Sequence, residues 1–150
     1  MSFGELHPFF VHFPIALVTV AAFFDVLGLF VNKSFFPKVG FTLLLVATAL
    51  AIAVGLSGYA AEAILEENIR ILAAVADNLT QHATAGNLAV WLIVALGLFR
   101  LWSVLERKNW ALQGWIFPIL SVLLSLWVIY TGLLGGKLAR AVVSAYQAMI

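Results

Sequence analysis

Long apolar stretches separated by short polar segments make up most of this sequence. A stretch of about 20 mainly apolar residues is long enough to cross a bilayer as a helix. The sequence contains four such stretches, at about residues 8–31, 39–59, 80–105 and 112–136. They predict an all-α integral membrane protein, a four-transmembrane-helix bundle that forms a single membrane domain.

Prolines and polar residues refine the predicted spans. Pro8 occupies a favourable first helical position, whereas Pro14 lies inside the first span and predicts a kink. Asp77, Asn78 and Thr80 offer capping side chains for the third span. Residues 60–76 combine apolar positions with charged ones and predict an interfacial helix between spans two and three. The tail, residues 137–150, is expected to be helical.

The composition agrees with a membrane protein and narrows the chemistry. Of 150 residues, 64% are hydrophobic and 10% are charged, against roughly 25% charged in globular proteins. The absence of cysteine excludes disulfides, Cys-ligated zinc, iron–sulfur clusters and covalently attached haem. A net charge of +1 without a basic cluster argues against nucleic-acid binding. The first apolar stretch lacks a basic leader, so we expect a permanent span and not a signal peptide.

The distribution of basic residues predicts the orientation in the membrane. The two short connections contain Lys33, Lys38, Arg107 and Lys108. Because lysine and arginine accumulate in cytoplasmic loops, these connections are expected inside the cell. Both termini and the histidines would then lie on the periplasmic side of a bacterial inner membrane.

The histidines are the first candidates for chemistry. His7 and His12 stand at the start of the first span, and His82 stands at the start of the third. Ionisable side chains at the edge of the hydrocarbon are costly, so they are candidates for a functional site.

A weak internal repeat relates these histidines. The shift of the chain that places His7 on His82 also places Asp25 on Arg100, so each histidine precedes its charged counterpart by the same interval. A slightly larger shift places 55–58 on 132–135. This pattern indicates two tandem helix pairs around an axis along the membrane normal. Chance alignment of apolar helices is the alternative.

Three interpretations of the histidines remain open. Two facing imidazoles can hold haem b, whereas all three, with Glu62 as a further ligand, can hold zinc or copper. The third interpretation is that the histidines bond only to backbone carbonyls or water at the interface.

Other residues have competing structural and functional interpretations. Gly58 and Gly135 would let a flat macrocycle approach the helices, but small residues also serve helix packing. Arg140 could neutralise haem propionates or simply anchor a helix end. Asp25 and Arg100 predict a structural ion pair within the membrane, with proton conduction as the alternative.

The beginning of the chain also supports a family resemblance. Leu6-His7-Pro8, Val11-His12-Phe13-Pro14-Ile15-Ala16-Leu17 and the later Asp25 resemble the bacterial membrane-protein family called domain of unknown function 2231. The resemblance implies four spans, a histidine opening the third helix and Gly-Gly-x-Leu near the end of the fourth, here 135–138. Relatives that carry cytochrome or Rieske-type modules imply electron transfer, although the family's function is not established.

These observations predict a membrane electron-transfer subunit resembling cytochrome b, more an accessory subunit than a stand-alone enzyme. Its expected cofactor is haem b, held by two histidines between the first and third spans. Expected partners are the lipid bilayer, a quinone and other redox subunits, and a homo-oligomer is left open. A non-haem metal protein and a structural subunit are the alternatives.

The predicted orientation can be tested by labelling single cysteines with an impermeant reagent in intact cells. A cysteine replacing Asn68 should react, because the segment between the second and third spans is expected outside, and one replacing Ser34 should not. The reverse pattern of labelling would show that the assignment is inverted.

Overall fold

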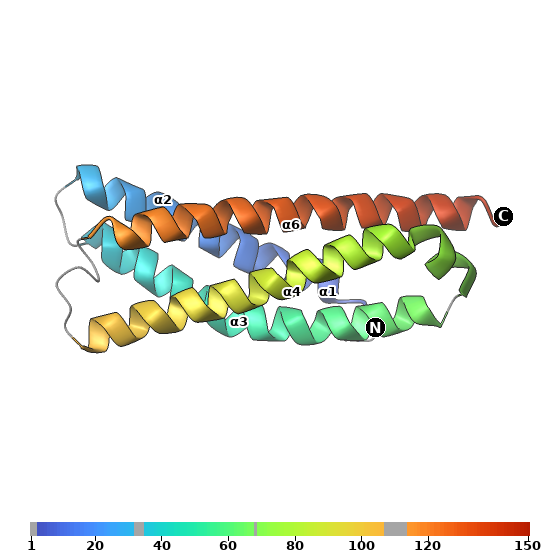
Figure 1. Ribbon diagram of the computed structural model, residues 1–150, viewed down its shortest axis with the longest axis horizontal. Coiled ribbons are helices and arrows are strands. Elements are labelled where there is room, and N and C mark those ends of the chain that lie inside the picture. The colour runs from blue at the N-terminus through green and yellow to red at the C-terminus, as the bar shows by residue number, and fades with distance from the viewer. Residues whose placement is uncertain (1–2, 32–34, 68, 107–113) are drawn as a thin grey trace.

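The computed structural model describes residues 3–31, 35–67, 69–106 and 114–150. Within them lie the helices α1 (His7–Phe10), α2 (His12–Phe30), α3 (Phe35–Glu66), α4 (Ile69–Leu105) and α6 (Ile116–Gln147). α1 and α2 together form one span, and four spans in the described residues are long and apolar enough to cross a membrane. The prediction of an all-α, four-span protein is therefore confirmed (Figure 1). Some residues used for the predicted topology lie outside the described ranges: Lys33, Ser34, Asn68, Arg107 and Lys108.

The first span is interrupted where the sequence predicted a kink. A turn at Val11 separates α1 from α2, and the hydrogen bond from the Ile15 amide to the Val11 carbonyl is stretched to 3.5 Å. Pro14, which is buried, has no amide hydrogen to continue the helical ladder. His7 and His12 consequently lie on different helical segments.

The segment 60–76 is helical, and it is divided between the end of α3 and the beginning of α4, whose first turns bend away from the axis of the rest of that helix (Figure 1). α3 continues to Glu66, and α4 begins at Ile69 and passes through 77–80 without starting a new helix there. Residues 60–66 contain three alanines and no glycine or proline, so nothing in them favours ending α3. Of the 37 residues of α4, Ala73–Leu105 form the candidate membrane span.

The four spans pack as a square. α2 packs against α3 and α6, and α4 also packs against α3 and α6, so α2 and α4 occupy opposite corners. This is the arrangement expected if α1–α3 and α4–α6 are equivalent helix pairs, because the first and third spans then occupy corresponding positions. α2 and α4 end, and α3 and α6 begin, at one end of the bundle, and α6 ends at the opposite end (Figure 1).

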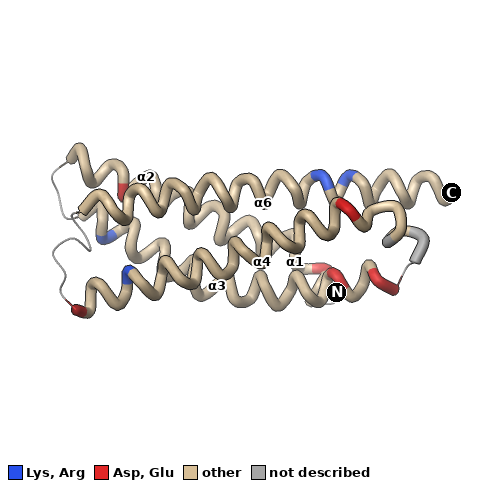
Figure 2. The backbone as a smooth tube through the Cα atoms, viewed as in Figure 1, with Lys and Arg blue, Asp and Glu red and all other residues tan. Residues whose placement is uncertain are grey.

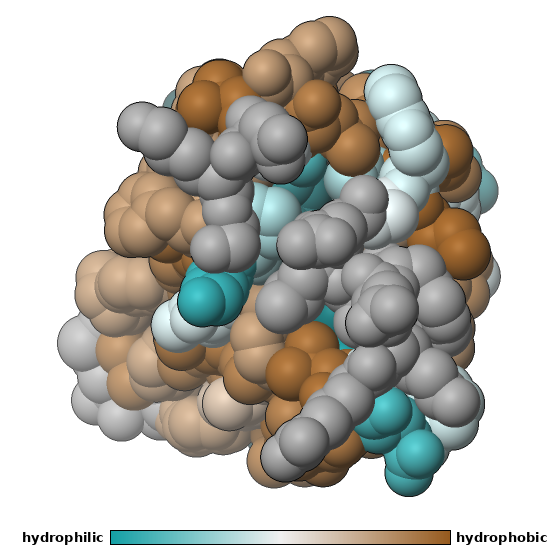
Figure 3. Space-filling model, turned by 90° about the vertical axis from the view of Figure 1, so that its left-hand side faces the viewer, coloured by the Kyte–Doolittle hydropathy of each residue, from teal (hydrophilic) through white to brown (hydrophobic). Residues whose placement is uncertain are grey.

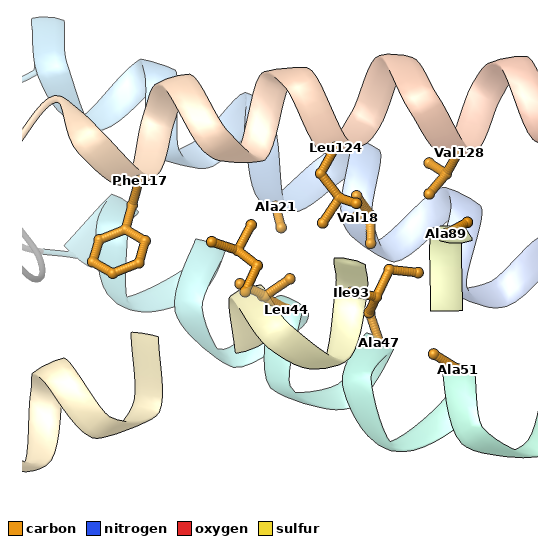
Figure 4. Packing of buried hydrophobic residues seen from close by; sticks show 11 residues of the cluster. Val18, Ala21, Leu44, Ala47, Ala51, Ala89, Ile93, Phe117, Leu124 and Val128 are labelled. Atoms are coloured by element: carbon orange, nitrogen blue, oxygen red, sulfur yellow. The ribbon is translucent and has the colours of Figure 1, made fainter. Parts of the chain in front are cut away.

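Alanine and branched aliphatic side chains fill the centre of the bundle. Figure 4 shows Ala21, Ala47, Ala51 and Ala89 among larger residues such as Leu44 and Leu124. Small side chains let membrane helices approach closely and gain van der Waals contact, the main attraction available where lipid is as apolar as leucine. The stability of the core therefore depends more on close fit between the helices than on the removal of apolar surface from water.

Large apolar side chains cover much of the outside of the bundle. Phe23, Ile52, Trp91 and Leu126 are 61%, 54%, 70% and 60% exposed. Among the described residues, the charged ones lie toward the two ends of the bundle and are absent from its middle (Figure 2). Seen from one end, apolar residues form most of the coloured surface (Figure 3). A surface of this kind is suited to contact with hydrocarbon.

A buried ion pair crosses the bundle near one end. The Arg100 guanidinium on α4 donates two hydrogen bonds to the Asp25 carboxylate on α2, at 2.7 and 2.6 Å. Each residue is only 1% exposed. The pair expected from the sequence is present, and its two-pronged geometry is the strongest that arginine and a carboxylate adopt.

The other two helices complete this ion pair. The Ser121 hydroxyl on α6 donates to Asp25 at 2.7 Å, and Arg100 also donates to the Pro37 carbonyl on α3 at 3.2 Å. A Cβ at Gly40 of α3 would overlap the Asp25 carboxylate. The guanidinium carbon lies 4.8 Å from the centre of the Phe117 ring, a favourable cation–π distance. All four spans thus contribute a contact to the Asp25–Arg100 ion pair.

We predict that this pair contributes to stability as a unit. Asp25→Ala and Arg100→Ala should each reduce the free energy of unfolding by about 3–5 kcal/mol, because each leaves a buried charge without its partner. The double variant should lose less than the sum of the two. Thermal unfolding in detergent provides the measurement, with Ser103→Ala, a buried serine bonded within its own helix, as control. Additive losses would show that the two charges do not stabilise each other.

Candidate functional site

The folded chain brings two of its three histidines together. His7 on α1 and His82 on α4 lie with ring centroids 6.3 Å apart and ring planes inclined by 68°. Both side chains are half-buried. Since α4 occupies the corner opposite the α1–α2 span, the two imidazoles meet across the diagonal of the bundle, although they belong to opposite halves of the chain.

Each imidazole rests against a glycine of the next long helix. A Cβ on Gly58 of α3 would lie 3.2 Å from Cε1 of His7, and a Cβ on Gly135 of α6 would lie 3.0 Å from Cε1 of His82. In both cases Nδ1 is the next nearest ring atom and Nε2 lies farther away. The two halves of the chain therefore build the same contact, which supports the internal repeat. Gly58 and Gly135 were predicted to leave room for a ligand. In the structure, the room beside each glycine is occupied by an imidazole.

The two rings differ in their hydrogen bonds. Nδ1 of His7 lies 2.9 Å from the Ser57 hydroxyl oxygen, and that hydroxyl donates to the Val54 carbonyl at 3.0 Å. Nδ1 of His82 is buried and has no hydrogen-bond partner among the described residues. A buried polar atom left without a partner is costly and uncommon in folded proteins.

The spacing of the rings fits a metal ion between them. Imidazole nitrogen binds metals at about 2 Å and lies roughly 1 Å outside the ring centre, so linear coordination separates two ring centroids by about 6 Å. The observed 6.3 Å agrees with this value. Neutral imidazole is a ligand for iron, copper and zinc. The same separation, with ring planes inclined by 68°, is also that of an ordinary edge-to-face ring pair, so the geometry is compatible with both arrangements.

The larger set of ligands considered from the sequence is not assembled. His12 lies on α2 with its side chain exposed, and Glu62 on α3 is half-exposed. In the described part of the chain, no three or more histidine, aspartate or glutamate side chains form a group that could hold a metal ion. The metal site of three histidines and Glu62 remains a prediction, and the described residues do not bring these four side chains together.

Arg140 lies beyond this site on α6, more than one helical turn after Gly135, and is exposed. Its Nη1 atom lies 3.7 Å from the position that a Cβ on Gly136 would occupy, so the side chain folds back along its own helix toward the histidine layer. This placement is compatible with pairing to an anionic group near the histidines and equally with anchoring at a headgroup.

Hydroxyl groups were the main omission from the sequence analysis. Ser57 and Ser121 are 0% and 2% exposed, and each contacts an ionisable side chain. The sequence signal for these contacts was a serine on the interior face of α3 and another on that of α6. Lipid offers no hydrogen bond, so a buried serine in a membrane helix needs a partner within the protein. Serine can also bond to its own helix, as Ser103 does with the Phe99 carbonyl, so the sequence could not identify those partners.

An apolar groove of about 610 Å³ lies apart from the histidines, between α4 and α6. Leu92, Phe99, Leu123 and Trp127 are among its lining residues. The Trp127 indole nitrogen, the polar group of these four residues, already donates to the Ala85 carbonyl at 3.2 Å. The groove thus belongs to the apolar outer surface.

Comparison with known families decides where the protein belongs. The family model described as "Predicted membrane protein (DUF2231)" matches residues 5–145. The chain belongs to this family. For this DUF2231 member, searches of curated proteins and of solved structures found no match. The resemblance inferred mainly from the N-terminal motif is confirmed and extends over both helix pairs.

The glycine contacts in this DUF2231 protein generate a stability prediction. Gly135→Ala should destabilise the fold or gain nothing, because crowding against His82, typically about 1–3 kcal/mol, offsets the improved helix propensity of about 1 kcal/mol. Gly55→Ala is the matched control, since its added Cβ would meet Val90 at an ordinary 3.6 Å. Thermal unfolding should rank Gly55→Ala above Gly135→Ala, and the opposite ranking would show that His82 does not need the glycine.

Proposed function

We propose that this protein is a membrane electron-transfer subunit resembling cytochrome b, in which His7 and His82 would hold a haem b. The observation that carries the proposal is that the two imidazoles meet across the bundle, with a centroid separation of 6.3 Å and ring planes inclined by 68°. Two ligands on opposite helices allow haem binding without cysteine, which the chain lacks.

The surroundings of the pair support haem over a closed metal site. Two histidines supply only two ligands, whereas structural zinc sites usually take four from the protein. A haem iron already has four ring nitrogens and needs only two more ligands. Gly58 and Gly135 lie on the two remaining helices and reduce steric bulk around the imidazoles. Arg140, exposed on the same side, could pair with a propionate.

Each residue of the pair has a simple role in this proposal. Bound haem would supply one-electron exchange at its iron. His7 and His82 would hold the iron from opposite sides, and the helices would orient the imidazoles and limit contact with water. The protein itself then needs no catalytic nucleophile or acid–base pair, which agrees with an accessory electron-transfer role.

The proposed orientation follows from the basic residues of the two connections, and the proposed partners follow from the position of the histidine pair in that orientation. We place both termini and the histidines on the periplasmic side of a bacterial inner membrane, using the basic residues of the two connections. A quinol or another redox subunit in the membrane would donate electrons, and a periplasmic protein would accept them. A homo-oligomer is compatible with the proposal.

Optical spectroscopy tests the proposal directly. We expect protein purified from cells with sufficient haem to show the sharp reduced bands of low-spin, bis-histidine iron. His7→Ala and His82→Ala should each abolish haem retention, because either change removes one of two ligands.

His12→Ala is the matched control, because His12 lies close to His7 in the sequence but is exposed on α2. It should retain haem. Retention of haem by the His82→Ala variant would refute the proposed ligand pair. Bound zinc or copper without haem bands, measured by elemental analysis, would favour the non-haem alternative. Absence of both would favour a structural subunit.

A further inference from the structure

The hydrogen bonds around Ser57 determine which nitrogen of His7 carries a proton. A serine hydroxyl has one hydrogen to donate, and Ser57 directs it to the Val54 carbonyl at 3.0 Å. Its oxygen can then only accept at the second contact, 2.9 Å from Nδ1 of His7. With the hydroxyl in this orientation Nδ1 carries the hydrogen and Nε2 has a free lone pair, whereas a hydroxyl turned toward Nδ1 would pair with the opposite tautomer.

The corresponding residue in the second half of the chain cannot do this. The shift that aligns Gly58 with Gly135 places Ser57 on Leu134. Leu134 is buried, at 4% exposure, and offers no hydrogen-bond acceptor on its side chain. Nδ1 of His82 makes no hydrogen bond of good geometry in the described part of the chain; the backbone carbonyl of Thr131, the counterpart of Val54, interacts with the His82 ring, as that of Val54 does with the His7 ring. The Ser57/Leu134 difference thus gives the two histidines different side-chain partners, beside the neighbouring differences Val54/Thr131 and Tyr59/Gly136.

We propose that Ser57 is a positioning residue that holds His7 as the Nδ1–H tautomer with Nε2 available as the ligand atom, and that the Ser57/Leu134 difference makes the two histidines unequal ligands. This inference rests on the proposed haem site for its consequence but not for its geometry. Hydrogen bonding at the outer nitrogen orients a ligating histidine and increases its basicity. His7 is therefore the stronger electron donor to the metal, and His82 the weaker.

Nitrogen-15 NMR of labelled histidine tests the tautomer without any cofactor. The experiment uses the full chain in lipid nanodiscs, carrying His12→Gln so that only His7 and His82 contribute signals. We expect His7 to show a protonated Nδ1 and an unprotonated Nε2. Ser57→Ala should shift His7 toward a mixture of tautomers, and Ser57→Thr, which keeps the hydroxyl, should restore the original signals. If Ser57→Ala leaves the His7 nitrogen signals unchanged, the proposal is wrong.

Reciprocal variants test the inequality of the two ligands in protein that contains haem. Ser57→Ala should weaken haem retention by about 10–100-fold, the usual effect of losing such a hydrogen bond, and should raise the reduction potential because His7 becomes a weaker donor. Leu134→Ser should lower the potential by providing His82 with an acceptor. Leu134→Ala opens a comparable space without a hydroxyl and is the matched control for Leu134→Ser.

The two measurements separate this inference from the proposed function. If no haem binds, the proposed function fails, while the NMR signals still decide whether Ser57 sets the tautomer. If haem binds and neither the potential nor the tautomer responds to Ser57→Ala, the haem site stands and the positioning role of Ser57 is refuted. Equal potentials for Leu134→Ser and Leu134→Ala would refute the inequality attributed to Leu134.

Discussion

The requirement that polar groups inside hydrocarbon find partners within the protein is the constraint on which this structure depends. It is most evident at Asp25 and Arg100, which are each 1% exposed and are joined by two short hydrogen bonds. Satisfying that pair requires a serine from α6, a carbonyl from α3 and a glycine that leaves room for the carboxylate. The ion pair therefore specifies how all four spans meet at one end of the bundle, whatever its net contribution to stability.

A second polar layer, the histidine pair, lies toward the other end. His7 precedes Asp25 by the same interval as His82 precedes Arg100, and that interval corresponds to about 27 Å of helix. Between the layers the core consists largely of small and aliphatic side chains. The two layers constrain the same helices from both sides, so the register that pairs Asp25 with Arg100 also brings His7 level with His82.

The two halves of the chain resemble each other in framework and differ in chemistry. Each half places a histidine against a glycine of its second long helix. The halves differ where one has Asp25 and the other Arg100, and where one has Ser57 and the other Leu134. The first difference creates an ion pair across the pseudo-twofold axis. The second gives the histidines different hydrogen-bond partners.

Much of the architecture was predictable from the sequence, because spans in a bilayer must be long, apolar and helical, and because Pro14 interrupts the helical hydrogen bonds wherever it is placed. The ion pair was also predictable, since two isolated opposite charges inside spans have few alternatives. The ends of the helices were harder to predict. Residues 60–76 have an amphipathic pattern, yet they belong to the end of α3 and the beginning of α4. Helix-forming residues without a breaker prolong a helix that is already stabilised by packing. The choice between His7 and His12 as the partner of His82 was decided only by tertiary structure. A spacing of five residues places the two side chains on different sides of the helical segment, and Gly58 provides room for His7. The hydrogen bond of Ser57 was equally inaccessible from the sequence, because it depends on where a residue 50 positions away in the chain is placed.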